Sequence, residues 1–93
     1  MSESDRAQLI EKLESAHSFP GSYTFRVIGE NHPDFPPSIE EALSNYTIQK
    51  TTQQRSNKGN HLSVRVTIMA PSPEAVLKSY EALSILNYVK YVL

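Results

Sequence analysis

The chain has 93 residues, which suffice for one domain but leave no room for a second. Apolar residues make up 39% and charged residues 20%, a composition that is typical of a small α+β domain and excludes disorder. Cysteine is absent, which excludes disulfides, a thiolate nucleophile and thiolate-ligated metal sites.

The N-terminal segment is polar and acidic, unlike a signal peptide, and no run of about 18 apolar residues could span a bilayer. We therefore predict a cytoplasmic location and no membrane contact. The net charge of −1 is unevenly distributed, because residues 46–72 contain basic residues and no acid. This segment could attract an anion, although Lys and Arg also protect exposed strand edges from aggregation.

The first half of the chain predicts a helix, a strand and a short second helix. Residues 4–16 have the apolar spacing of an amphipathic helix, with Ser4 as its N-cap. The side chains of residues 23–28 alternate between two faces, which predicts a strand. Residues 29–37 contain three prolines and predict a loop.

Ser38 and Glu41 have the spacing of a capping box. They predict a short helix that begins at Ser38 and ends around residues 44–45.

The second half predicts a hairpin, a helix and a last strand. Residues 46–54 and 62–69 read as strands, joined by a turn at residues 57–60. Ser72, followed by proline and glutamate, has the pattern of an N-cap that opens a helix. Residues 88–93 predict a terminal strand, in which Val92 and Leu93 should be buried.

The order after the leading helix is β-α-β-β-α-β, which indicates an α+β, ferredoxin-like sandwich. We expect a four-stranded antiparallel sheet with two helices on one face. The domain organisation is then an N-terminal amphipathic helix at 1–18 and a single domain at 19–93.

Five blocks of sequence resemble the YbeD-like family of small bacterial cytosolic proteins, which have no assigned activity. They are F-P at 19–20, Y-T-F-R-V-I-G at 23–29, S-N-K-G-N-H-L-S-V at 56–64, V-L-K-S-Y-E-A-L at 76–83 and V-K-Y-V-L at 89–93. The resemblance implies a ferredoxin-like fold similar to the ACT domains, which regulate metabolic enzymes by binding small ligands. A regulatory role follows by analogy of fold.

In ACT-like domains a small ligand usually lies beside the loop after the first strand, often at a dimer contact. That loop predicts a ligand site whose glycine allows close backbone approach and whose polar groups bind an amine or hydroxyl. Its residues are Gly29, Glu30, Asn31, His32 and Asp34. An ordinary surface loop would have the same composition.

The acid-free hairpin predicts a second site, for an anion or a protein partner. Its residues are Lys50, Arg55, Lys58, Asn60 and Arg65. The sheet face away from the helices should be polar with a basic centre, so an acidic helix could lie on it; the N-terminal helix of this chain is one candidate. That face should carry Thr24, Arg26, Thr47, Gln49, Ser63, Arg65 and Thr67.

RNA binding is a weaker alternative. RNA-reading ferredoxin-like domains place aromatic side chains on the third strand after a Lys-Gly pair. Lys58 and Gly59 fit that pattern, but Asn60, Leu62 and Arg65 occupy the aromatic positions.

An enzyme is not predicted. The three histidines lie in separate segments, and residues 30–34 alone do not assemble a metal or acid–base site. We therefore expect no cofactor, no metal and no catalysis. The main prediction is an accessory or regulatory domain that acts through a small ligand or a protein partner. The alternative is a protein-interaction adaptor that uses the basic hairpin and sheet face. The sequence is also compatible with a homodimer.

Overall fold

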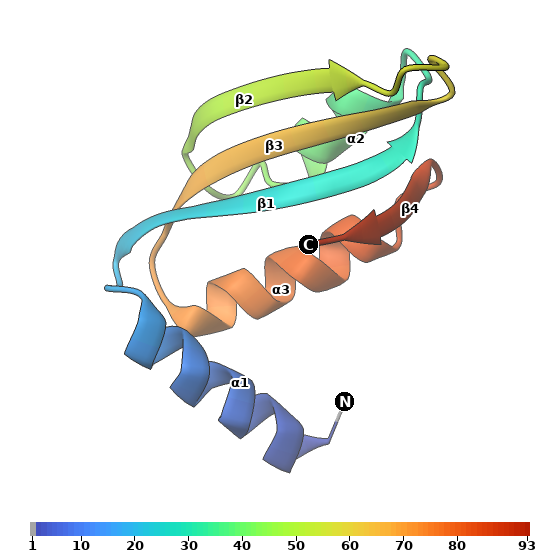
Figure 1. Cartoon of the computed structure of the whole chain (residues 1–93). Coiled ribbons are helices and arrows are strands. Elements are labelled where there is room, and N and C mark those ends of the chain that lie inside the picture. The colour runs from blue at the N-terminus through green and yellow to red at the C-terminus, as the bar shows by residue number, and fades with distance from the viewer. Residues whose placement is uncertain (1) are drawn as a thin grey trace.

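The computed structural model describes residues 2–93, which form a four-stranded sheet with helices on one side (Figure 1). The elements in chain order are α1 (Glu3–Ala16), β1 (Gly21–Glu30), α2 (Phe35–Ala42), β2 (Ile48–Arg55), β3 (His61–Ala70), α3 (Pro73–Ser84) and β4 (Val89–Val92). The strand order is β2-β3-β1-β4 and every pairing is antiparallel. The predicted ferredoxin-like α+β fold is confirmed.

The two central strands, β1 and β3, pair over ten residues without interruption, from Gly21 opposite Ala70 to Glu30 opposite His61. Side chains alternate along a strand, so one face of this ladder is apolar and the other polar. The apolar face packs against α2 and α3 and forms the core of the domain, with each fully buried large side chain contributing about 1.5–3 kcal/mol. The core residues of these four elements include Phe25, Val27, Val64, Val66, Ile68, Phe35, Ile39, Val76 and Leu83.

Helix α2 begins earlier than predicted, and the loop predicted at residues 29–37 is only partly a loop. Strand β1 continues to Glu30 and the helix begins at Phe35, so Pro36 and Pro37 lie in its first turn. Proline is tolerated there because the first N–H groups of a helix have no intrahelical partner. Ser38 lies inside the helix, where its hydroxyl donates to the Phe35 carbonyl at 2.6 Å. The predicted capping box is therefore wrong.

The other predicted caps have different outcomes. Ser2, not Ser4, caps α1, because its hydroxyl accepts a hydrogen bond from the Asp5 N–H at 3.2 Å. The predicted cap of α3 is confirmed, with Ser72 Oγ accepting from the Ala75 N–H at 3.3 Å.

Helix α1 lies beside α3, on the same side of the sheet as the other helices (Figure 1). It buries no residue fully, although Leu13 packs against the core cluster, and Arg6 Nη1 approaches Glu81 Oε1 at 3.5 Å. The prediction that α1 could cover the polar sheet face is wrong. Its apolar stripe finds apolar partners on α3 that the polar face does not offer.

A cluster of aromatic rings joins the start of β1 to α3. Tyr80 packs edge-on against Phe25 with ring centroids 4.9 Å apart, and the Tyr80 and Tyr23 hydroxyls lie 3.0 Å apart. Burial, together with the hydrogen bond to Tyr23, raises the pKa of Tyr80 above its ordinary value of 10.0. The folded state therefore holds the Tyr80 proton more tightly than the unfolded chain does.

We predict that Tyr80 makes the folded protein sensitive to alkali. Its contribution is fully present below the ordinary pKa of 10.0 and is lost as the pH rises above it, because the unfolded chain deprotonates first. Urea unfolding between pH 8 and 11 should show a steeper loss of stability for the wild type than for Tyr80→Phe. Equal slopes for the two proteins would contradict the raised pKa.

The C-terminal residue is held in the sheet by its backbone. The Leu93 N–H donates to the Arg26 carbonyl at 2.7 Å, and the Arg26 N–H donates to the Leu93 carbonyl at 3.0 Å. Val92 lies opposite Val27 and is half-buried. The predicted burial of Leu93 is wrong, since its side chain is 57% exposed. Strand β4 therefore closes the β1 edge through main-chain pairing, while Val89 and Val92 pack against the core.

Deleting residues 90–93 should abolish cooperative unfolding, because β1 would lose the main-chain partners of its second edge. Thermal melting followed by circular dichroism would measure this loss. The matched control is Leu93→Ala, which keeps the backbone bonds and removes only a largely exposed side chain, so it should melt as the wild type does. A truncated protein with wild-type melting would contradict the assignment.

Candidate functional site

Gly29, the first residue of the predicted ligand loop, is a packing residue at the end of β1. A Cβ at this position would overlap the Tyr88 carbonyl oxygen and would lie 2.7 Å from Cζ of Phe35. Only glycine therefore lets β1 approach the start of β4 and α2 this closely. The packing of the domain accounts for this glycine without a ligand.

The polar groups of the same loop bind other parts of the chain. Asn31 Nδ2 donates to the Gly59 carbonyl at 2.9 Å, and the Asn31 N–H donates to the Asn60 carbonyl at 3.1 Å. The His32 ring stacks on the Tyr88 ring at a centroid distance of 4.1 Å. These contacts fasten the loop to the hairpin turn and to the start of β4.

The Asp34 N–H donates to His32 Nδ1 at 3.0 Å, and the Glu30 N–H donates to the Tyr88 carbonyl at 2.9 Å. The concavities described below are lined by other residues. Ligand binding by Gly29, Glu30, Asn31, His32 and Asp34 therefore stays a prediction.

The hairpin residues predicted to bind an anion or a partner fall into two groups. Lys58 and Asn60 lie in the turn, where Gly59 has a φ of 76°, and Arg55 ends β2. Lys50 and Arg65 lie further along the strands, opposite Thr67 and Thr52. Binding by these residues also stays a prediction.

Arg65 belongs to the polar sheet face that carries no helix, which we call the open face. Its members point away from the core, and Thr24 and Thr67 join β1 to β3 on this face through a hydroxyl contact of 2.8 Å. Gln49 also lies here, accepting a hydrogen bond from Ser22 Oγ at 2.6 Å. Thr47, which was predicted on this face, precedes β2, and its carbonyl accepts from the Met69 N–H at 3.0 Å.

Two arginines lie directly opposite each other at the centre of the open face. Arg26 of β1 pairs in register with Arg65 of β3. Arg26 exchanges both of its backbone hydrogen bonds with Leu93 on its other side, so its pair with Arg65 is not hydrogen-bonded. In such pairs the Cα atoms are only about 4.5 Å apart and the side chains come closest. Like charges in this position repel and destabilise the sheet.

Neither guanidinium has a carboxylate to neutralise it. Within residues 2–93, the only Arg or Lys side chain within 4.0 Å of an acidic oxygen is that of Arg6, on α1. Arg26 Nε instead donates to Ser63 Oγ at 3.2 Å. Both arginines are exposed. Neither guanidinium of the central pair therefore forms an ion pair with the described part of the chain, and both side chains are exposed to solvent.

The charges of the molecule are separated between its two sides. Of the ten acidic residues, nine lie on the helices or at the position that precedes α2, and Glu30 alone lies in a strand, opposite His61. These nine acids are Glu3, Asp5, Glu11, Glu14, Asp34, Glu40, Glu41, Glu74 and Glu81. The open face therefore presents a positive field and the helical side a negative one.

Two neighbouring concavities lie on the open face. The smaller, of about 320 Å³, is lined by Arg26, Arg65, Ser63, Thr52, Gln53 and Gln54. The larger, of about 720 Å³, extends toward the hairpin and β4, and Ile28 and Tyr91 line it together with Lys90 and Arg55. Arg26, Ser63 and Gln54 belong to both. Two polar hollows therefore meet at Arg26.

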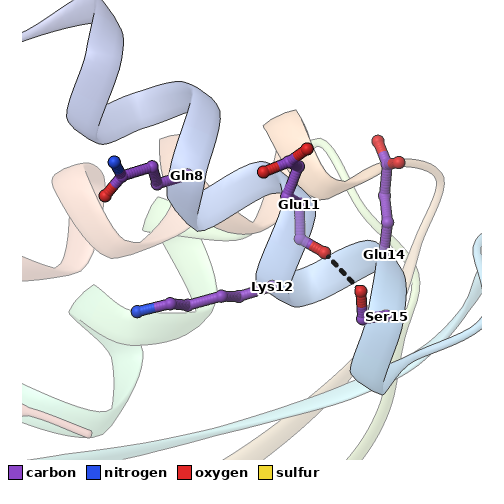
Figure 2. Close-up of a pocket in the computed structure, with 5 residues that line it drawn as sticks. All are labelled: Gln8, Glu11, Lys12, Glu14 and Ser15. Atoms are coloured by element: carbon purple, nitrogen blue, oxygen red, sulfur yellow. Dashed lines mark hydrogen bonds between the residues drawn. The ribbon is translucent and has the colours of Figure 1, made fainter.

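Two other concavities do not bring together basic side chains from several elements. Figure 2 shows one whose lining side chains, Gln8, Glu11, Lys12, Glu14 and Ser15, all project from α1 alone. Ser15 Oγ donates to the Glu11 carbonyl at 2.9 Å, so even its hydroxyl is used within the helix. A further groove of about 710 Å³ runs between α1, α3 and β4, and its apolar lining reflects the loose packing of α1.

Tyr91 was not predicted at this site, whereas Arg26 was predicted on the sheet face away from the helices but not opposite Arg65. The alternation of apolar and polar residues in the two strands places both Arg26 and Arg65 on the polar face of the sheet. What the sequence alone did not provide was the register that places them opposite each other.

The strand order and the helices on one side of the sheet define a ferredoxin-like domain, whose fold is similar to that of ACT domains. The ACT domain from the GTP pyrophosphokinase of Chlorobium tepidum is similar with a TM-score of 0.66 and 14% identity, over 77% of this chain and 94% of that domain. The C-terminal domain of the MgtC protein from Mycobacterium tuberculosis is similar with a TM-score of 0.60 and 18% identity, over 77% and 82% of the two chains. At these identities the likeness concerns the fold alone.

Residues 14–93 match the family described as "Protein of unknown function (DUF493)", and the chain belongs to this family. A UPF0250 protein from Janthinobacterium sp. (strain Marseille) is 33% identical over 88 residues, which cover 90% of this chain and 97% of the relative. Another from Yersinia pestis (strain Pestoides F) is 36% identical over 84 residues, covering 88% and 97%. The resemblance to small bacterial proteins of the YbeD-like type is confirmed.

If the paired arginines repel each other, removing one charge should stabilise the protein. We predict that Arg65→Gln raises the free energy of unfolding by about 0.2–1 kcal/mol at low salt. The gain should shrink as salt is added, because exposed charges are screened. Lys78→Gln, an exposed change on α3, is the charge-matched control and should not stabilise. Urea unfolding gives both values; destabilisation by Arg65→Gln would contradict the repulsion.

Proposed function

We propose that this protein is a non-catalytic regulatory module that binds an anionic ligand or partner through its open face. The observation that carries the proposal is the Arg26–Arg65 pair, which is in register, exposed and without a carboxylate partner. Such a pair lowers the stability of the sheet, and an anion bound between the two guanidiniums would offset that repulsion.

The likeness to the ACT domain of a GTP pyrophosphokinase supports a regulatory role by analogy of fold. The relatives named above have no enzymatic name, and the absence of catalysis is part of our proposal. The cytoplasmic location predicted from the sequence belongs to the same proposal.

A protein-interaction adaptor is a second candidate, and one observation favours it. The larger concavity continues the open face toward the hairpin, where Arg55, Ser56 and Asn57 line it. An acidic protein segment could therefore contact the arginine pair and the hairpin together.

The proposal is tested by recovery of bound molecules from a lysate of the native cell. Three forms of the protein serve as bait: the wild type, Arg26→Gln/Arg65→Gln and Lys12→Gln/Lys78→Gln. The last removes the same charge from exposed positions on the helical side. Mass spectrometry of proteins and of small molecules released on denaturation should find a species that only the open-face variant loses. Equal recovery by a folded open-face variant would contradict the proposal.

If the protein is an adaptor, its hairpin should contact the partner as well. Lys58→Gln changes the turn and leaves the arginine pair intact. If an acidic protein segment contacts both, this variant should recover less of that protein than the wild type. Unchanged recovery would limit the site to the centre of the open face.

A further inference from the structure

The smaller concavity has the donors that a phosphate group requires. Arg26 and Arg65 both line it, and each side chain ends in a guanidinium. Arginine binds phosphate through paired N–H donors, and two positive charges match the charge of a phosphate monoester better than that of a single carboxylate. Ser63, Thr52 and Gln54, whose side chains carry hydroxyl and amide groups, line the same hollow. They could satisfy the remaining oxygens.

The larger concavity has what a flat ring requires. Tyr91 lies opposite Ile28 on the open face, and its side chain is 54% exposed. An exposed aromatic ring beside an apolar side chain offers a surface on which another ring can stack. The volume of about 720 Å³ lies within the range of about 300–1,000 Å³ that small-molecule sites occupy.

The two hollows are spaced for one molecule. Arg26 lines both, and Ile28 is two residues further along the same strand, which corresponds to about 6.6 Å. A ligand could therefore place its phosphate at the arginine pair and its ring at Tyr91, with one sugar or a short chain between them.

We propose that the open face binds a small phosphate monoester that carries a flat ring, of which a nucleoside monophosphate is the simplest example. This inference rests on the proposed function and names its ligand class. RNA is the less favoured occupant. RNA-reading sheets stack two or three bases on aromatic side chains, whereas Tyr91 is the only Tyr, Phe or Trp on the open face within residues 2–93.

The test is a nuclear magnetic resonance titration of the full chain, labelled with ¹⁵N, at constant ionic strength. The probes are adenosine 5′-monophosphate (AMP), adenosine and inorganic phosphate. AMP should perturb the signals of Arg26, Arg65 and Tyr91. It should bind about fivefold or more tightly than phosphate, the lower end of what one stacked ring contributes. The proposal would be overturned if adenosine bound at least as tightly as AMP. It would also be overturned if the signal changes were spread evenly over the helices.

Variants separate the two halves of the site. Arg65→Gln should weaken the binding of both phosphate and AMP, and Arg26→Gln should do the same. Tyr91→Ala should weaken the binding of AMP and leave the binding of phosphate unchanged. Lys78→Gln, on α3, should change neither. A variant that keeps the wild-type amide spectrum is folded, so its binding can be compared directly. If phosphate binds Arg65→Gln as tightly as the wild type, the arginine pair is not the phosphate site.

A glutamate-rich peptide distinguishes this proposal from the one on which it rests, and an oligouridylate compared with uridine monophosphate tests for RNA. If AMP and phosphate leave the spectrum unchanged while a glutamate-rich peptide perturbs Arg26 and Arg65, the phosphate monoester is wrong and the proposed function stands. If none of these anions perturbs the open face, both are wrong. Tighter binding of an oligouridylate than of uridine monophosphate, with a steep salt dependence, would assign the face to RNA and overturn the small ligand.

Discussion

The antiparallel pairing of β1 with β3 determines both faces of the molecule. Its ten uninterrupted pairs place Phe25 opposite Val66 and Val27 opposite Val64, and the same register places Arg26 opposite Arg65. A slip of one residue would exchange the two faces and expose the core. The apolar face therefore fixes a register that the polar face alone would oppose. The arginine pair is a consequence of the same ladder that forms the core.

The separation of charge follows from this arrangement. Nine of the ten acids lie on the helices or just before α2, and the central strands carry basic and hydroxyl side chains outward. Core burial far outweighs a repulsion of about 0.2–1 kcal/mol between two exposed arginines, so the fold tolerates the pair. A sheet face with unneutralised guanidiniums gains most from a ligand that brings negative charge. In this account, the same feature costs stability in the free protein and gives affinity in the complex.

Much of the fold could be predicted from the sequence because alternation and capping are local signals. Leu62 to Ile68 alternate clearly, and Ser72 caps α3 as its neighbours indicate. The start of α2 was missed because the prolines were read as helix breakers, although proline is compatible with a first helical turn. The site was predicted only in part. The register that brings Arg26 to Arg65, and the packing that encloses Gly29, are properties of the assembled sheet.

The most direct measurement is a double-mutant cycle on the Arg26–Arg65 pair in two salts of equal ionic strength. Unfolding free energies of the wild type, both single Gln variants and the double variant give the coupling energy between the two side chains. We predict that the coupling is unfavourable in sodium chloride and becomes favourable in sodium phosphate, where one anion contacts both guanidiniums. The same coupling in both salts would contradict an anion site at the centre of the open face.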